Sequence, residues 1–243
     1  MRRQSAPQDT HRASEATPRN RVLLSWSSGK DSAWALHVLR QSPHLEVVGL
    51  LTTMNARFDR VAMHGVRREL VEAQAHAANL PMLTAPLPWP CSNSEYEAVM
   101  ERALDLAQSH WRFTHVAFGD LFLEDVRRYR EEKLAERTAY VPVFPLWGIN
   151  TTQLAHEMID GGLRAHITCV DPGQIPRDFA GRQFDADLLN ALPAEADPCG
   201  ERGEFHTFAW DGPMFVHPIA VLHGETVERD GFVFTDLLAN PSG

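Results

Sequence analysis

Cysteine is scarce in this chain of 243 residues, with three copies that lie far apart at Cys91, Cys169 and Cys199. An odd number of separated cysteines argues against the disulfide framework of a small secreted domain. Long apolar runs are missing as well, since none approaches the roughly 18 residues that a membrane-spanning helix requires. No apolar segment follows Arg2 and Arg3, as it would in a secretory or twin-arginine signal. These absences predict a cytoplasmic protein without a membrane partner.

Basic charge is also in short supply. The chain has 23 Lys and Arg against 32 Asp and Glu, which gives a formal net charge of −9. Proteins that bind bulk RNA or DNA owe much of their affinity to basic side chains that neutralise phosphates, so this balance predicts no such partner. A local basic pocket for a nucleotide remains compatible with it. The apolar content of 44% is ordinary for a globular protein with a real core.

Strand-like and helical segments alternate along most of the chain. Residues 1–19 hold almost no apolar side chains and are predicted to form a disordered tail. Ser94 and Glu97 predict a capping box at the start of a helix. The alternation is typical of a doubly wound parallel sheet with helices on both faces. The predicted strands are 21–26, 46–52, 81–87, 114–118, 141–146 and 165–170, and the predicted helices are 31–40, 66–79, 94–110, 124–137 and 151–161.

The composition changes after Asp171. The chain becomes richer in Gly, Pro and acidic residues, and it ends in short β-like runs at 214–222 and 232–235. Its length allows either one large α/β domain or a larger domain with a smaller second lobe. The change favours the second arrangement, with a smaller α+β lobe at the C-terminus.

The first predicted strand runs into a loop of small residues that opens the first predicted helix. The loop reads Ser27-Ser28-Gly29-Lys30-Asp31-Ser32. Unpaired backbone N–H groups and the helix dipole make such a loop an anion site. Gly29 would let the backbone approach a phosphate, the serine hydroxyls would donate hydrogen bonds, and Lys30 would add positive charge. Asp31 could cap the helix or hold Mg²⁺.

This loop is not a Walker A motif. That motif has a Gly where this chain has Leu24, and a Ser or Thr where Asp31 follows Lys30. A surface turn with a capped helix is the alternative interpretation. The position after the first strand of an alternating sheet favours a ligand site, because ligands bind at the carboxyl ends of such strands.

The loop resembles the SGGKDS loop of the PP-loop ATP pyrophosphatase superfamily, whose members bind ATP and split it between the α and β phosphates. Ser28 replaces the first Gly of that pattern, which is tolerable if the φ angle of Ser28 is negative. Over about residues 20–235 the chain is similar to the diphthine–ammonia ligase family, and especially to its bacterial branch. The segments that carry this similarity are His64, PLPWPCSNSEYE at 86–97, FGDLFLEDVRRYRE at 118–131, PLWG at 145–148 and CGERGEFHTF at 199–208.

The last of these segments, called the Gly/Glu block below, is the most specific. It is similar to the family's Gly-Glu-x-Gly-Glu-Phe-x-Thr pattern, and the matching residues are Gly200, Glu201, Gly203, Glu204, Phe205 and Thr207. The resemblance implies a Rossmann-like, adenine nucleotide alpha hydrolase-like fold. It further implies a PP-loop nucleotide-binding domain at 20–145 and a substrate-binding domain at 146–243.

The activity implied by the resemblance is an ATP-dependent ligation that requires Mg²⁺. A carboxylate is adenylated and ammonia then displaces AMP, so that AMP and pyrophosphate are released. The carboxylate would lie on a small molecule or on a modified protein side chain, and a homodimer is a possible assembly. A small acid of cofactor or nucleotide metabolism is the second candidate for the substrate.

The resemblance also assigns roles to residues. The ATP site would consist of Ser27, Ser28, Gly29, Lys30, Asp31, Ser32 and His64. The catalytic residues would be Lys30, Asp31, Glu201 and Glu204, with Asp31 also as metal ligand. One of the two glutamates would orient or deprotonate the ammonium if burial raises its pKa toward neutrality. The substrate would contact Asp120, Arg127, Arg130, Gly203 and Thr207.

Several of these assignments have an alternative interpretation. Arg127 and Arg130 lie three apart on one predicted helical face, which fits either an anion grip or a solvated charged helix. His64 is either a nucleotide contact or a structural loop histidine. For the whole chain, the alternatives are an RNA-modifying PP-loop enzyme and an adenine-nucleotide sensor without turnover. The first commonly has paired cysteines, which this chain lacks, and pyrophosphate release would separate the second from a ligase.

Overall fold

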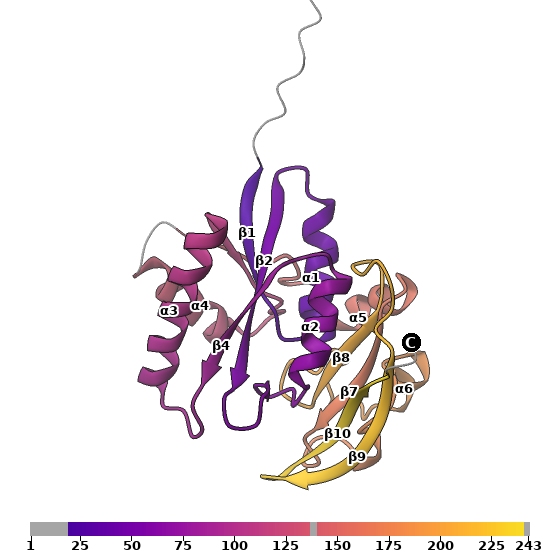
Figure 1. Cartoon of the computed structure of the whole chain (residues 1–243). Coiled ribbons are helices and arrows are strands. Elements are labelled where there is room, and N and C mark those ends of the chain that lie inside the picture. Colours follow the sequence, from indigo (N-terminus) through magenta and orange to yellow (C-terminus); the bar gives the residue numbers. More distant parts are fainter. Residues whose placement is uncertain (1–18, 137–139, 241–243) are drawn as a thin grey trace, which may run out of the picture.

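A computed structural model describes residues 19–136 and 140–240, so the predicted tail lies outside the described residues except for Arg19. The described residues form two sheets (Figure 1). The first, sheet A, has the order β3-β2-β1-β5-β6, with β4 also paired to β2. Its pairings are parallel apart from that of β2 with β3. Its strands are β1 (Asn20–Ser25), β2 (Leu45–Asn55), β3 (Arg60–Val61), β4 (Met82–Leu87), β5 (His115–Ala117) and β6 (Val141–Val143).

The second sheet, sheet B, is antiparallel throughout and has the order β8-β7-β10-β9. Its strands are β7 (Arg164–Val170), β8 (Phe205–Asp211), β9 (Val221–Arg229) and β10 (Phe232–Ala239). The mixed α/β class, with a mainly parallel sheet and a smaller lobe, is therefore confirmed. The proposed domain boundary between residues 145 and 146 falls after the last strand of sheet A, and it stays a proposal.

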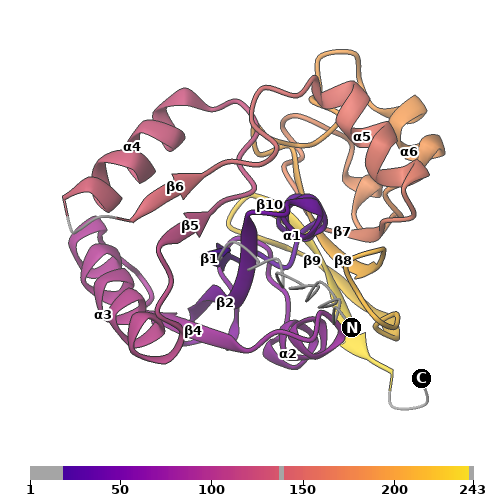
Figure 2. The same cartoon turned by 90° about the horizontal axis from the view of Figure 1, so that it is seen from above.

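Helices cover both faces of sheet A (Figure 2). On one face lie α3 (Asn93–Trp111) and α4 (Glu124–Ala135), and on the other lie α1 (Lys30–Gln41) and α2 (Arg68–Ala77). The second pair stands between the two sheets, since α1 contacts β8 and α2 contacts β10. On the side of the molecule opposite α3 and α4 lie α5 (Thr151–Asp160) and α6 (Ala186–Ala191), and a short 3₁₀ helix, η1 (Arg177–Phe179), precedes α6.

The apolar alternation of β1 explains this layering. Leu23 packs into the core under α3, whereas Val22 and Leu24 pack into a larger core on the other face. That larger core continues through α1 and α2 to Ile167 and Phe208 of sheet B. A strand that is apolar on both faces is what a central parallel strand requires. Because one core reaches both sheets, sheet B is packed firmly against the helix that begins at the SSGKDS loop.

Three expectations about elements were wrong. Segment 165–170 does not continue the parallel sheet, because β8 and β10 pair with it on either side in sheet B. The run 214–222 is a strand only at its end, because Met214 and Phe215 are buried in the core outside any strand. Strand β8, in the Gly/Glu block, was not expected. The predicted end of α4 at Arg137 lies outside the described residues.

The capping box of α3 lies two residues earlier than predicted. The hydroxyl of Ser92 accepts a hydrogen bond from the backbone N–H of Glu95, whose carboxylate accepts the backbone N–H of Ser92 at 2.8 Å. The Glu97 carboxylate instead lies 3.3 Å from Nζ of Lys133 on α4. Ser92-x-x-Glu95 and Ser94-x-x-Glu97 both fit the capping pattern, and the ion pair to α4 uses the second glutamate. In the described ranges, no helix combines the length and hydropathy that a membrane crossing would need.

Candidate active site

The SSGKDS loop follows β1 directly, and α1 begins at Lys30 with Gly29 as its N-cap residue. Asp31 therefore does not cap the helix, as was one expectation, but lies in its first turn. The expectation that the loop N–H groups are free holds only in part. The N–H of Gly29 donates to Oγ of Ser27 at 3.3 Å, and that of Lys30 donates to Oγ1 of Thr207 at 3.0 Å. The backbone N–H groups that bond to no other described residue are those of Ser27, Ser28, Asp31 and Ser32.

Two glycines make room for this loop. A Cβ atom on Gly29 would lie 2.7 Å from Cε1 of His64, which is too close for two carbon atoms. A Cβ atom on Gly119, just after β5, would lie 3.0 Å from the backbone N of Ser32. The absence of side chains at both positions lets α1 start in contact with the neighbouring strand ends.

A buried glutamine that the sequence reasoning missed holds the loop from behind. Nε2 of Gln74 donates to the carbonyl of Ser28 at 2.9 Å and to that of Ala209 at 2.6 Å. Its Oε1 accepts the indole N–H of Trp26 at 2.9 Å. Gln74 is fully buried on the apolar face of α2. A polar side chain on an otherwise apolar helix face was the signal that could have indicated this role.

Ser28 has a φ angle of 69°, so the condition under which serine was expected to be tolerable is not met. The left-handed conformation costs an L-residue about 1–2 kcal/mol. Its carbonyl accepts from Gln74 and from the backbone N–H of Ala209 at 3.0 Å, and these bonds fix the peptide orientation. The Ser28 hydroxyl is buried and bonds to no other described residue. The loop therefore keeps the shape that a glycine would favour, with a serine in it.

We predict that Ser28→Gly stabilises the protein by about 1 kcal/mol, because it relieves the left-handed strain and removes a buried unpaired hydroxyl. Thermal unfolding should detect a rise of about 2–4 °C in Tm for a chain of this size. Asp230 is a matched control, since it also has a positive φ, of 52°, but is exposed. Asp230→Gly should change the unfolding free energy by less than about 0.5 kcal/mol, because aspartate adopts the left-handed conformation more readily than serine and this side chain is exposed. A fall in Tm for Ser28→Gly would contradict the strain argument.

Lys30 is the cationic residue of the loop, and its side chain is only 2% exposed. Its Nζ lies 2.9 and 2.8 Å from the two carboxylate oxygens of Asp31 and also donates to the carbonyl of Cys199 in the Gly/Glu block. The rings of Phe184 and Phe205 lie 5.6 and 5.4 Å from Nζ. Burial is the largest influence and lowers the pKa of the Lys30 ammonium, but the attraction and hydrogen bond of Asp31, together with the attraction of Cys199 and Glu201, outweigh it, so the pKa lies above its usual value. Lys30 is therefore charged at neutral pH.

Glu201 lies in the same pocket as Lys30 and Asp31. Its Oε1 accepts the backbone N–H of Leu121 at 2.8 Å. Burial raises the pKa of the Glu201 carboxyl to about 7, although the hydrogen bond from Leu121 lowers it, and the negative charge of Asp31 raises it further. A carboxyl group with a pKa near 7 can both accept and release a proton at physiological pH.

Glu204 is in a different environment. Its side chain is 1% exposed and does not line the pocket, whereas Gly203 does. One carboxylate oxygen accepts the backbone N–H of Asp197 at 2.7 Å, and the other accepts that of Arg202 at 3.0 Å. The carboxylate thus ties together the turn that carries Glu201. We therefore propose a positioning role for Glu204 in place of the catalytic role assigned from the sequence.

Replacing Glu204 by Gln should test that role. An amide can accept only one of the two N–H donors and turns an NH₂ group toward the other, so the free energy of unfolding should fall by about 2 kcal/mol. Urea unfolding would measure this loss. Turnover at saturating substrate should stay within about threefold of the wild type in the folded protein, because no reacting group is removed. A variant with wild-type stability but no turnover would restore the catalytic assignment.

His64 forms a pair with His206. Nδ1 of His64 donates to the carbonyl of Thr207 at 3.0 Å, and the two imidazole rings are tilted by 35° with centroids 4.6 Å apart. Burial lowers the pKa of His64 to about 4 and that of His206 to about 3. Both rings are thus neutral at pH 7 and line the pocket as hydrogen-bonding groups without charge.

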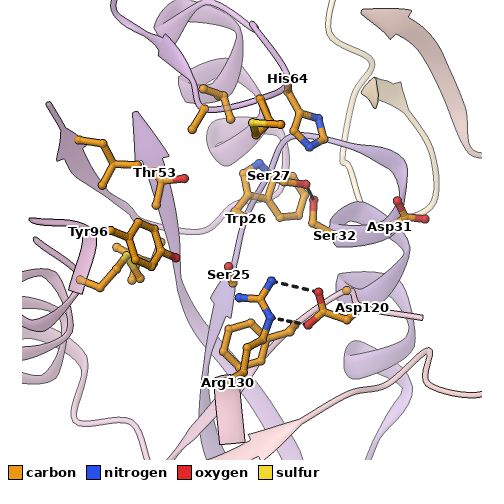
Figure 3. A pocket seen from close by; sticks show the side chains of 18 of the residues that line it. Ser25, Trp26, Ser27, Asp31, Ser32, Thr53, His64, Tyr96, Asp120 and Arg130 are labelled. Carbon is orange, nitrogen blue, oxygen red and sulfur yellow. Dashed lines mark hydrogen bonds and ion pairs between the residues drawn. The ribbon is translucent and has the colours of Figure 1, made fainter. Parts of the chain in front are cut away.

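Arg127 and Arg130 of α4 do not act together. Arg130 lines the pocket and holds Asp120, with Nε 2.5 Å and one terminal nitrogen 3.0 Å from the carboxylate oxygens (Figure 3). Arg127 bonds to Glu131 at 2.7 Å and does not line the pocket. The prediction that both arginines face one anion is therefore wrong for Arg127. Asp120 and Arg130 neutralise each other, so they form a fixed polar wall.

These groups surround a cavity of about 710 Å³ at the carboxyl ends of the parallel strands, a volume within the range of small-molecule sites (Figure 3). Trp26, Trp89 and Tyr96 add aromatic wall. Among the described residues, no group of three His, Cys, Asp or Glu could hold a metal ion. Mg²⁺ needs only one or two carboxylates when phosphate oxygens supply the rest, and the Asp31 carboxylate at the pocket wall suits that part.

Comparison with known proteins agrees with the resemblance found in the sequence. Residues 150–236 match the family model described as diphthamide synthase C-terminal domain. The chain is 27% identical over 236 residues to the diphthine–ammonia ligases of Bos taurus and Homo sapiens, an alignment that spans 88% of this chain and 87% of each relative. It is 25% identical to that of Schizosaccharomyces pombe over 86% of this chain and 37% of the relative. The similarity to diphthine–ammonia ligases is thereby confirmed, and the assignment to a bacterial branch stays a prediction.

Proposed function

We propose that this chain is an ATP-dependent ligase that adenylates a carboxylate and transfers ammonia to it, with release of AMP and pyrophosphate. One observation carries the proposal. The SSGKDS loop and the Gly/Glu block, about 170 residues apart, meet on one lysine. Thr207 binds the backbone N–H of Lys30, and the carbonyl of Cys199 accepts from its ammonium. The likeness to proteins named diphthine–ammonia ligase supports a ligase activity.

The loop suits the binding of a triphosphate. The free N–H groups at the start of α1 and the Lys30 ammonium present positive charge to an anion in the pocket. We assign Asp31 to a Mg²⁺ ion, which would neutralise the phosphate oxygens when it is bound with ATP. Lys30 would stabilise the charge that develops on pyrophosphate as the bond to the α phosphate breaks. The carboxylate of the substrate takes the adenylyl group and becomes a good electrophile.

Glu201 is our choice for the base of the second step. The nitrogen of ammonia forms a bond to the activated carbonyl carbon, and the bond from that carbon to the AMP oxygen breaks. One proton must leave the nitrogen, and the Glu201 carboxylate can accept it because its pKa is about 7. The fixed pair of Asp120 and Arg130 bounds the same cavity and would orient the substrate.

The two buried cysteines, Cys169 and Cys199, give no support to a thiol-transfer reaction, whereas Cys91 is half-buried and lines the pocket. Cys199 is buried, and its backbone carbonyl accepts a hydrogen bond from Lys30. Burial raises the pKa of its thiol above the usual range. Burial also raises the pKa of Cys169 to about 12. A thiol of such high pKa is a poor nucleophile, so the ligase is preferred over an RNA thiolase.

The test is a product analysis with α-labelled ATP. The protein is incubated with Mg²⁺, an ammonium salt and a panel of carboxylic acids, and nucleotides are separated by chromatography. We expect AMP and pyrophosphate in equal amounts, with amide formed only when acid and ammonium are both present. Formation of ADP, or binding of ATP with no acid-dependent turnover, would refute the proposal.

A further inference from the structure

A second chamber, of about 380 Å³, lies beside the active-site pocket between β3 and sheet B. Its floor is formed by buried side chains of β7 and β10, among them Thr168, Cys169 and Thr235. Phe232 and Phe234 of β10 and Val227 of β9 form an apolar side wall. None of the assigned site residues from the loop or the Gly/Glu block lines this chamber, whereas His206 does.

The chamber adjoins the active-site pocket through a common wall. The two cavities share six of their lining residues: Asn55, Val61, Ala62, Met63, Trp89 and His206. His206 is the residue of the Gly/Glu block in this wall, and the centroid of its ring lies 4.6 Å from that of His64. A ligand that reached from one cavity to the other would pass this imidazole.

The chamber offers no unpaired buried charge. Arg60 lies 2.7 Å from Asp236, which also binds Arg67, so each of these three charges has a partner. The two floor hydroxyls are also occupied, since Thr168 donates to the carbonyl of His206 at 3.4 Å and Thr235 lies 2.8 Å from the hydroxyl of Thr226. The remaining charged lining residues, within the described ranges, are exposed at the rim: Glu225, Arg229 and Asp230. Below this rim, a ligand body would gain apolar contacts and meet only charges that already have partners.

We infer that this chamber binds the body of the carboxylic acid, that the body is uncharged and largely apolar, and that the carboxylate passes His206 toward the nucleotide pocket. The inference rests on the proposed function and names the class of its substrate. The neutral imidazole of His206 can donate one hydrogen bond to the carboxylate. Because the ring carries no charge, this contact does not require a cation to lose its hydration. The acid and the nucleotide thus occupy separate cavities and meet at the common wall.

Val227→Trp tests this inference, because Val227 lines the chamber but not the nucleotide pocket. Leu222→Trp is the matched control, since Leu222 is exposed on the same strand and lines neither cavity. The probes are octanoate and 8-aminooctanoate, and binding is measured by calorimetry with the full chain and α,β-methylene-ATP. We expect Val227→Trp to weaken octanoate binding by about tenfold or more, because the larger side chain would occupy part of the chamber. Leu222→Trp should leave octanoate binding unchanged. α,β-Methylene-ATP should bind equally to the wild type and to both variants.

8-Aminooctanoate should bind the wild type about tenfold more weakly than octanoate, because its ammonium would lose water without gaining a partner. Equal or tighter binding of 8-aminooctanoate would overturn the uncharged body. No binding of octanoate, or equal octanoate binding to the wild type and Val227→Trp, would overturn the chamber as the acid site. If octanoate binds as expected but no acid yields AMP and pyrophosphate, the ligase proposal fails while the chamber assignment stands.

Discussion

Lys30→Met is expected to lower the rate of AMP and pyrophosphate formation by about a thousandfold. Methionine keeps much of the volume of the buried side chain but removes the cation that, in the proposed reaction, would stabilise the leaving pyrophosphate. Since Lys30 is 2% exposed, no solvent ion can readily take its place. A stopped assay of AMP formation at saturating ATP would measure the loss. Lys133→Met is the control, because Lys133 lines the same pocket but is more than a third exposed. Its effect should not exceed about threefold.

The Lys30 variant also leaves the Asp31 carboxylate without its partner. Breaking a buried pair in this way costs about 3–5 kcal/mol, so a loss of activity could reflect unfolding. The double variant Lys30→Met with Asp31→Asn removes the unpaired charge and should recover part of the stability, which chemical denaturation would show. Its activity should stay as low as that of the single variant or lower. Recovery of activity together with stability would mean that Lys30 serves the fold and not the reaction.

Glu201→Gln is expected to lower the rate of amide formation by about a hundredfold and to change its pH dependence. The pKa of Glu201 is raised to about 7 by burial, so the wild-type carboxyl is mostly protonated below pH 7 and mostly ionised above it. A base works only when ionised. The wild-type rate should therefore rise about tenfold per pH unit below pH 7 and level off above it. The glutamine variant has no such group and should show no rise of this kind.

Ammonia itself titrates, so the measurement must keep the concentration of free NH₃ constant as the pH changes. Adenylation can be followed in the same samples through pyrophosphate exchange, which needs no ammonia. We expect Glu201→Gln to leave that exchange within about threefold of the wild type. Glu136→Gln is the control, since Glu136 lines the pocket but is exposed. A pH profile of the Glu201 variant that parallels the wild type would assign the base to another group.

Local features of the site could be predicted from the sequence. A strand, a loop of small residues and a helix are contiguous in the chain, so their pattern could predict that a helix begins at this loop. The anion site assigned to that helix start stays a prediction. The spacing of Arg127 and Arg130 was also local, yet it could not tell which arginine faces the pocket. Arg127 stacks on Trp147, 4.7 Å from its ring, and Arg130 on Phe118, 4.4 Å from its ring. Those partners come from other segments, and they decide the direction of each side chain.

What the sequence could not supply depends on pairing between distant segments. The backbone N–H of Ala209 in β8 donates to the carbonyl of Ser28. The side-chain amide of Gln74 in α2 donates to the same carbonyl. No periodicity connects these positions, because such contacts follow from how the sheets and helices pack. The left-handed Ser28 follows from the same bonds, which hold its peptide in place. The meeting of Glu201 with the loop could be anticipated only through resemblance to a family.

The hydrogen bond from Lys30 to Thr207 has a wider consequence. The loop that would receive the triphosphate is completed by a strand from the far end of the chain, so neither part presents a finished site alone. Occupancy of the loop and the docking of β8 must then favour each other by the same free energy, whichever happens first. Binding of the nucleotide would therefore stabilise the packing of the carboxyl-terminal sheet against the first helix.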